Sequence, residues 1–178
     1  MTIGSARARH ELVEYASAIC PHCAEFHRTN WARLKADYID RGRLRYTLHE
    51  MLTPPPAVAL GMFQLARCQN TDPHEYMRRL GIMFERQHDI IASGTMVGVR
   101  DSLVALGGEW ALTQDQVMAC LTDQNGVTRI QRSIDEATAR GVTGTPTFFL
   151  DGTRVDDPAF HTPDGMAQIL DAALRRRR

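Results

Sequence analysis

Cys20 and Cys23 are the residues whose types and spacing most directly indicate chemistry. Two thiols separated by two residues can close a disulfide and reopen it by exchange with another thiol. Residues 11–17 predict a strand, and residues 24–40, which contain no Gly or Pro, predict a helix. Cys20 is therefore expected at a helix N-terminus, where unpaired N–H groups and the helix dipole favour a thiolate. Pro21 suits the first helical turn, because a missing N–H costs nothing there.

The Cys-x-x-Cys spacing alone leaves three interpretations open: a redox pair, half of a zinc site, or a chance pattern. A structural zinc site needs four ligands, usually from two such pairs, and the remaining cysteines, Cys68 and Cys120, are isolated in the sequence. His22 and His27 lie close to the pair, so a zinc site stays an alternative. The position between a strand and a long helix, with a Thr-Pro-Thr element at residues 145–147, favours a redox pair without a metal.

Composition and charge limit the class of protein. The chain has 178 residues, of which 43% are hydrophobic and 24% are charged, and this is typical of one globular domain with room for an insertion. The formal net charge is zero, so no basic excess is present to neutralise phosphates, and nucleic acid is not expected as a partner. No apolar run approaches the roughly 18 residues that would indicate a membrane span.

Two features of the sequence point to different compartments. Residues 1–10 lack the long apolar run of a secretory signal, so either the protein is cytoplasmic or its export signal is not part of this sequence. The four cysteines favour an oxidising compartment, and we expect a periplasmic protein, with the cytoplasm as the alternative. Residues 175–178 are all arginine and are expected to form a solvated terminus.

The predicted elements place two parts that contain strands on either side of a helical block. The expected strands are residues 10–17, 43–51, 147–150 and 153–155, with a hairpin turn at residues 151–152. The expected helices are residues 24–40, 57–68, 73–86, 96–106, 113–121, 124–140 and one beginning near residue 162. The β-α-β order at the start predicts a parallel strand pair. We expect one α/β domain from residues 1–52 and 142–178, and an all-helical insertion from residues 53–141.

Two segments together resemble the DsbA family of thiol-disulfide oxidoreductases. Residues 15–26 read Tyr-Ala-Ser-Ala-Ile-Cys-Pro-His-Cys-Ala-Glu-Phe, and residues 141–149 read Gly-Val-Thr-Gly-Thr-Pro-Thr-Phe-Phe. The resemblance covers nearly the whole chain, because the helical block lies where that family carries a helical insertion. It implies a thioredoxin-like fold, a nucleophilic Cys20, a resolving Cys23 and a cis Pro146 opposite them.

The same resemblance concerns two further residues. It implies that Glu14, six residues before Cys20, matches a buried acid in related proteins. His27 departs from the family pattern, because some members carry another acid at this position.

Physical reasoning assigns roles to the residues of the two motifs. We expect Cys20 to be exposed, with a pKa lowered by the helix N-terminus and by His22. A stable thiolate in turn makes the oxidised form a strong disulfide donor. Cys23, one turn further in, is expected to be buried with a higher pKa. With Pro146 in cis, Thr145 would present free backbone groups to an extended substrate segment.

Cys68 and Cys120 fall in two predicted helices of the insertion. They could be two buried thiols that pack as small hydrophobic residues. We favour a structural disulfide between them, because the redox pair indicates a protein made for an oxidising compartment.

The leading hypothesis is an oxidoreductase that donates the Cys20–Cys23 disulfide to unfolded or reduced substrate proteins by exchange, with no other cofactor. A membrane or soluble redox partner would then reoxidise the pair. Two alternatives stay open: a disulfide isomerase or reductase on the same fold, and a non-catalytic module that binds zinc or peptides.

Overall fold

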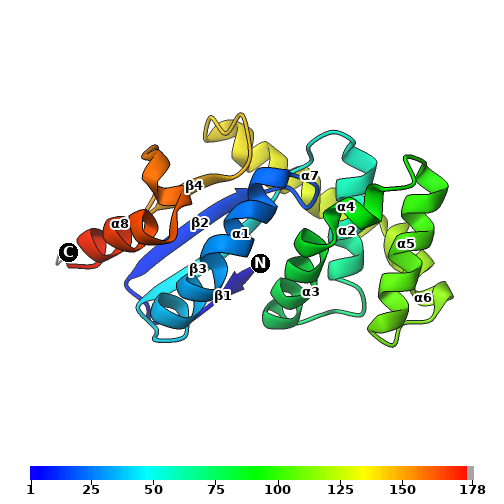
Figure 1. Ribbon diagram of the computed structural model, residues 1–178, viewed down its shortest axis with the longest axis horizontal. Helices are drawn as coiled ribbons and strands as arrows, with labels where there is room; N and C mark the ends of the chain where they lie inside the picture. The colour runs from blue at the N-terminus through cyan, green and yellow to red at the C-terminus, as the bar shows by residue number, and fades with distance from the viewer. Residues whose placement is uncertain (176–178) are drawn as a thin grey trace.

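The computed structural model describes residues 1–175, and its centre is a five-stranded sheet with the order β1-β3-β2-β4-β5 (Figure 1). The strands are β1 (Thr2–Ile3), β2 (His10–Ala16), β3 (Leu44–Glu50), β4 (Thr147–Leu150) and β5 (Thr153–Arg154). β2 and β3 are parallel, which confirms the prediction, and the other neighbouring pairs are antiparallel. Of the basic tail, residues 176–178 lie outside the described residues.

Helices make up most of the remaining chain. They are α1 (Pro21–Leu34), α2 (Pro56–Ala66), α3 (Pro73–Glu85), α4 (Gln87–Ile91), α5 (Met96–Glu109), α6 (Gln114–Leu121), α7 (Gln124–Ala139) and α8 (Pro163–Arg175), with a π-helical turn at Lys35–Ile39 and a 3-10 turn at Pro158–His161. Within residues 1–175, no helix has both the length and the apolar character needed to cross a bilayer.

The side chains of β2 alternate between two cores, as those of a central strand must. Leu12 belongs to the larger core, together with Phe26 of α1. Val13 and Tyr15 point to the opposite face, where they pack with Ala137 of α7. The sheet is therefore covered on both faces, and the carboxyl end of β2 leads directly into α1.

The helical block, α2 to α7, lies between β3 and β4 in the sequence. In space α2 to α6 lie to one side of the sheet, whereas α7 runs back over it and packs on the face that carries Val13 and Tyr15 (Figure 1). Its caps follow the sequence: Asp72 accepts hydrogen bonds from the first turn of α3, and Thr113 and Gln116 form a capping box at α6. The larger core continues from the sheet into this block through Met62, Phe63 and Leu103, among others. The domain boundaries at residues 52 and 142 stay a prediction.

Some elements differ from the prediction. The predicted helix 24–40 begins earlier, at Pro21, and ends in a π-helical turn where the Asp40 N–H donates to the Lys35 carbonyl. β1 and α4 were missed, since two and five residues are too few to show a period. α5 continues past its predicted end, and Gly107 lets this part of the helix pack closely on α6, because a Cβ there would clash with Val117.

Candidate active site

Cys20 is the N-cap residue of α1, and Pro21 occupies the first helical turn, as the sequence predicts. The backbone of Cys20 is extended (φ −76°, ψ 120°), and its side chain lies at the end of α1 where the N–H groups of the first turn have no partner within the helix. Cys23 lies one turn further along α1 and has no exposed surface. Both cysteines are free thiols, so the structure represents the reduced pair.

The expected exposure of Cys20 is wrong, because only 6% of this residue is accessible. The loop before β4 covers it. The Thr145–Pro146 peptide bond is cis, and the Cys20 Sγ lies 3.2 Å from the Thr145 carbonyl oxygen, to which it donates a hydrogen bond in its protonated form. The sequence placed this loop opposite the thiols, but it could not show how closely the loop backbone approaches the sulfur.

The surroundings of Cys20 lower its pKa from 9.0 to about 5. The largest cause is a hydrogen bond from the Cys23 thiol. Burial opposes the shift, and the proximity of Thr145 and hydrogen bonds from the backbone N–H groups of Cys23 and His22 add to it. The His22 ring is exposed, so this residue acts on Cys20 through its backbone.

Cys23 shows the opposite behaviour, and its pKa is raised well above 9.0. Burial is the largest cause, followed by the hydrogen bond to Cys20 and by the negative charge of Glu14. Near neutral pH the reduced pair therefore holds one thiolate, on Cys20, and one thiol, on Cys23.

Glu14 of β2 is fully buried and has two side-chain partners. The Tyr46 hydroxyl donates to Glu14 Oε2 at 2.5 Å, and His27 Nε2 lies 3.1 Å from the same oxygen. Burial raises the pKa of Tyr46 well above 10.0, so its hydroxyl keeps the proton that it donates. The structure thus brings His27, the departure from the family pattern, into direct contact with the buried acid.

His27 connects this acid to the surface of the molecule. Its ring lies between Trp31, at 5.1 Å between ring centroids, and Phe84 of α3, at 4.5 Å. The three residues line a cavity of about 210 Å³ beside α1. Glu14 therefore lies between a buried thiol on one side and an imidazole that reaches a cavity on the other.

Gln87 is a site residue that the sequence analysis missed. It is the first residue of α4, and its Nε2 donates to the carbonyl oxygens of Ala18, at 2.8 Å, and Cys20, at 3.1 Å. These bonds connect the helical block to the turn that leads into α1. A single glutamine in a polar segment carries no signal of such a contact, so the sequence offered no means of finding it.

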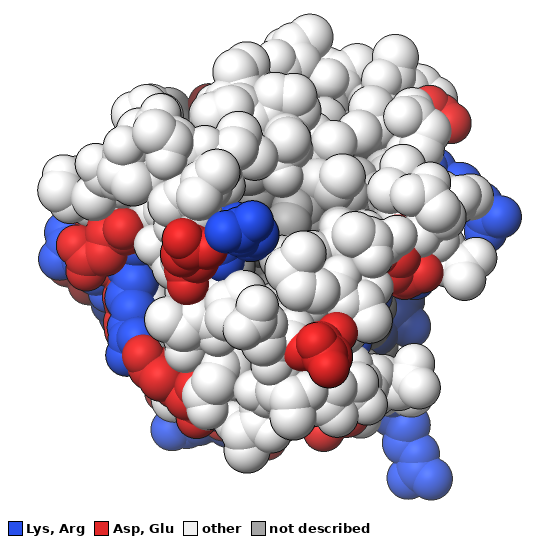
Figure 2. Space-filling view, turned by 90° about the vertical axis from the view of Figure 1, so that its right-hand side faces the viewer, with Lys and Arg blue, Asp and Glu red and all other residues white. Residues whose placement is uncertain are grey.

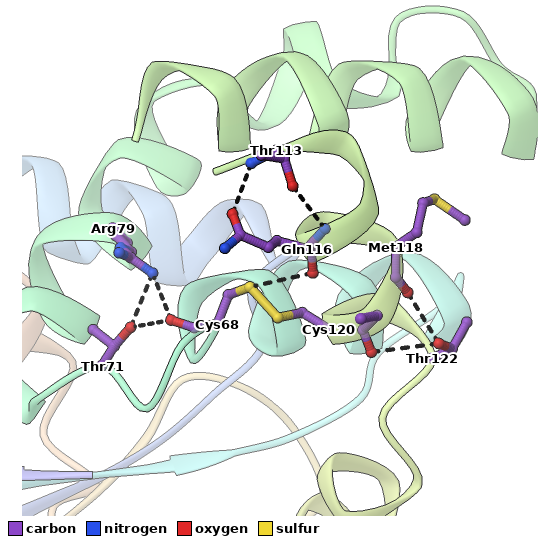
Figure 3. Close-up of a disulfide and its surroundings, with 9 residues drawn as sticks. Cys68, Thr71, Arg79, Thr113, Gln116, Met118, Cys120 and Thr122 are labelled. Carbon is purple, nitrogen blue, oxygen red and sulfur yellow. Dashed lines mark hydrogen bonds between the residues drawn. A yellow bond between two sulfur atoms is a disulfide. The ribbon is translucent and has the colours of Figure 1, made fainter. Parts of the chain in front are cut away.

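Cys68 and Cys120 form a disulfide, as we favoured, and their Cα atoms are 5.5 Å apart (Figure 3). The bridge joins the segment after α2 to α6. Arg79 of α3 donates to the Cys68 carbonyl oxygen and to Thr71, which fixes the backbone beside the bridge. Among residues 1–175 there is no group of three or more His, Cys, Asp or Glu side chains that could hold a metal ion.

Comparisons with known proteins agree with this geometry. A family model described as thioredoxin matches residues 1–172. A Rickettsia prowazekii protein, provisionally named a protein-disulfide oxidoreductase, is 27% identical over 175 residues, which is 98% of this chain and 61% of that protein. The chain thus spans about three fifths of the length of such curated relatives.

Solved structures show the same fold. Wolbachia pipientis alpha-DsbA1 superposes with a TM-score of 0.81 at 22% identity, covering 97% of this chain and 89% of that chain. BdbD from Bacillus subtilis gives a TM-score of 0.80 at 17% identity, covering 98% of this chain and 92% of that chain. With its Cys-x-x-Cys pair at the start of α1 and its helices inserted between β3 and β4, the chain belongs to the thioredoxin family and has the fold of the DsbA proteins.

Proposed function

We propose that the chain is a protein-disulfide oxidoreductase that donates the Cys20–Cys23 disulfide to substrate proteins. The observation that carries this proposal is the opposite protonation of two thiols on one helical turn: the pKa of Cys20 is lowered to about 5 and that of Cys23 is raised. A low pKa makes Cys20 a good leaving group and stabilises the reduced pair. The oxidised pair then tends to take electrons from other thiols.

The transfer takes two exchange steps. A substrate thiolate attacks Cys20 Sγ of the oxidised pair, the Cys20–Cys23 bond breaks, and Cys23 leaves with the electron pair and takes up a proton. A second substrate thiolate then attacks the substrate sulfur of the mixed disulfide and expels Cys20 as a thiolate. The substrate loses two electrons and gains a disulfide, and the Cys20–Cys23 pair gains the two electrons.

Glu14 is the group that exchanges a proton with Cys23 in this scheme. Its negative charge acts on the Cys23 thiol, and its carboxylate is held by Tyr46 and His27. A buried carboxyl whose charge acts on a buried thiol can, in its protonated form, deliver a proton as the thiolate forms, and His27 can then return a proton to the carboxylate from the cavity beside α1.

The surroundings of Cys20 support an unfolded protein as substrate. Neither the Cys20 thiolate nor the Cys20–Cys23 disulfide has an S–H to donate, so in both states the Thr145 carbonyl is free to accept a backbone N–H of a bound segment. Elsewhere on the helical block, Ile91 at the end of α4 and Met96 and Val97 at the start of α5 are exposed. Figure 2, seen from the side on which α5 lies in Figure 1, shows few charged side chains over its upper part.

Reoxidation and location complete the proposal. A membrane or soluble redox partner must accept the two electrons, because the reduced pair does not regenerate itself. A strong thiol oxidant and a disulfide in the insertion both suit the periplasm better than a reducing cytoplasm.

The test is single-turnover oxidation of a reduced, unfolded protein by the oxidised chain, with free thiols counted over time. We expect Cys20→Ser and Cys23→Ser each to abolish transfer, and Cys68→Ala/Cys120→Ala to retain it. In addition, Cys23→Ser should trap mixed disulfides at Cys20 when the substrate supplies an activated disulfide. Transfer that survives Cys20→Ser would contradict the proposal.

A further inference from the structure

The cavity beside α1 begins at the active-site turn and lies between α1 and α3, two helices that run side by side (Figure 1). Two of its lining residues also belong to the surroundings of Cys20. Pro21 follows Cys20 in the chain, and Gln87 donates to the Cys20 carbonyl oxygen at 3.1 Å. The cavity is therefore continuous with the surface at which a substrate thiol meets Cys20.

The lining of this cavity suits an apolar group. Ala24 and Trp31 of α1 are half-buried, and Phe84 of α3 is 5% exposed, so their apolar surfaces face the cavity without closing it. Its volume of about 210 Å³ is below the roughly 300 Å³ at which sites for drug-sized ligands begin. The size thus fits one large side chain rather than a whole small molecule.

The charges around the cavity disfavour an anion. Glu25 and Arg28, both exposed, are paired with each other at 2.6 Å. Glu85 has no cation within ion-pair distance in residues 1–175, because the neighbouring Arg86 is paired with Glu109 at 2.7 Å. The remaining charge is therefore negative, and an uncharged apolar group is a better occupant than an acidic one.

Gly81 keeps this cavity open. It is an interior residue of α3, where glycine is the least favourable residue after proline. At Gly107 and Gly165 the fold supplies a reason for glycine, since a Cβ would clash with a neighbouring element. Around a Cβ built at Gly81, no heavy atom of residues 1–175 lies within 4 Å, apart from its chain neighbours and the backbone of its own helix. This glycine therefore leaves open a space that the packing of α1 and α3 does not use.

A substrate segment bound at Cys20 can reach this space. Along α1, Ala24 lies about 6 Å and Trp31 about 16 Å from Cys20, at a rise of about 1.5 Å per residue. An extended chain advances about 3.3 Å per residue, so a side chain about two to five positions from the attacking cysteine comes level with the cavity.

We propose that the cavity between α1 and α3 is a specificity subsite, which takes one large apolar side chain of the substrate protein close in sequence to the cysteine that attacks Cys20. This inference rests on the proposed function, because it concerns the substrate bound at Cys20. Large apolar side chains are mostly buried in folded proteins and are accessible in unfolded ones. The subsite thus directs disulfide transfer toward proteins that have not yet folded.

The experiment uses the oxidised full chain and synthetic peptides that each contain one cysteine. In the anchor peptides, a phenylalanine stands two to five residues from the cysteine, on either side; in the reference peptide, alanine takes all these positions. The loss of peptide thiols over time gives the ratio of the anchor rate to the reference rate. This ratio cancels any change in the exchange chemistry that is common to both peptides.

Gly81→Leu fills the cavity with a side chain that favours a helix. Gly108→Leu is the matched control, because Gly108 is an exposed glycine of α5 with equally open surroundings and does not line this cavity. Gly81→Ala adds a single methyl group and separates the loss of glycine from the loss of space. Dithiothreitol, which has no side chain to bind, is oxidised in parallel.

We expect the best anchor peptide to react about tenfold faster than the reference peptide, the low end of what burial of one large apolar side chain supplies. The ratio should fall to about one in Gly81→Leu, stay about tenfold in Gly108→Leu and be mostly retained in Gly81→Ala. A photoreactive phenylalanine analogue at the best position should crosslink to α1 or α3 of the wild-type chain, a result that does not depend on how the variants fold.

Equal rates for anchor and reference peptides, a ratio that survives Gly81→Leu, or crosslinks only to other elements would each overturn the subsite. In these cases peptide and dithiothreitol thiols are still oxidised, so the proposed function stands. If dithiothreitol and all the peptides keep their thiols, the proposed function fails and the subsite falls with it.

Discussion

The Cys20 thiolate makes the stability of the reduced protein depend on pH in a direction set by the structure. The pKa of Cys20 is about 5 in the folded protein and 9.0 without its partners. A lowered pKa stabilises the fold fully above pH 9, and this stabilisation is lost as the pH falls through 5. At pH 7 the folded group is ionised and the unfolded one is not, a difference of about two pKa units, or roughly 3 kcal/mol.

The perturbation is Cys20→Ser, measured against the reduced wild-type chain by urea unfolding at pH 7 and at pH 4. For each protein, the free energy of unfolding at pH 4 is subtracted from that at pH 7. The other titrating groups are common to both proteins, so the wild-type value minus the variant value gives the contribution of Cys20. Between pH 7 and pH 4, we expect the free energy of unfolding of the wild-type chain to fall by about 3 kcal/mol more than that of the variant. The same free energy corresponds to about 60 mV of a more oxidising potential, which equilibration with glutathione measures.

The thiolate absorbance in the ultraviolet gives an independent reading of the same quantity. It should titrate with a midpoint near pH 5 in the reduced chain and should be missing in Cys20→Ser. A midpoint above pH 8, or equal pH dependence of stability in the two proteins, would refute the argument that hydrogen bonds at the start of α1 hold the thiolate. A potential as reducing as that of a thiol reductase would favour the reductase alternative.

Three further perturbations test other parts of the molecule. Glu14→Gln keeps a hydrogen-bond partner for Tyr46 but removes the group that carries the proton, so single-turnover disulfide transfer should slow on the order of a hundredfold. Alkylation of Cys20 in the reduced chain should stay fast. An unchanged rate of transfer would exclude this role of Glu14. Cys68→Ala/Cys120→Ala removes a crosslink across a sequence separation of 52, so urea unfolding should show a loss of about 4 kcal/mol, and a loss below about 1 kcal/mol would contradict the loop-entropy argument. Gln87→Ala leaves two carbonyl groups without their donor and should cost about 1 kcal/mol, with faster hydrogen exchange at the start of α1 as the diagnostic change.

The sequence predicts the parts of the site that depend on local order along the chain. Cys20, Pro21 and Cys23 lie within four consecutive positions, and their place at a strand-helix junction follows from hydrophobic periodicity on either side. The long helices of the insertion were predicted for the same reason, because periodicity and caps such as Asp72 are local signals.

The parts that could not be predicted depend on contacts between distant segments. The burial of Cys20 is caused by Thr145, which lies 125 positions away, and Gln87 approaches the same turn from 67 positions away. Neither residue carries a local pattern that indicates its partner. His27 could be identified as unusual from the sequence, but its contact with Glu14 required the packing of α1 on β2.

These contacts show why the helical insertion is part of the active site rather than a separate attachment. Phe84 of α3 packs on His27, and Gln87 of α4 binds the turn before α1. The insertion thereby positions both the imidazole beside the buried acid and the carbonyl groups around Cys20. The Cys68–Cys120 disulfide in turn joins the segment between α2 and α3 to α6, so the helices that contact the active-site turn are also crosslinked within the insertion.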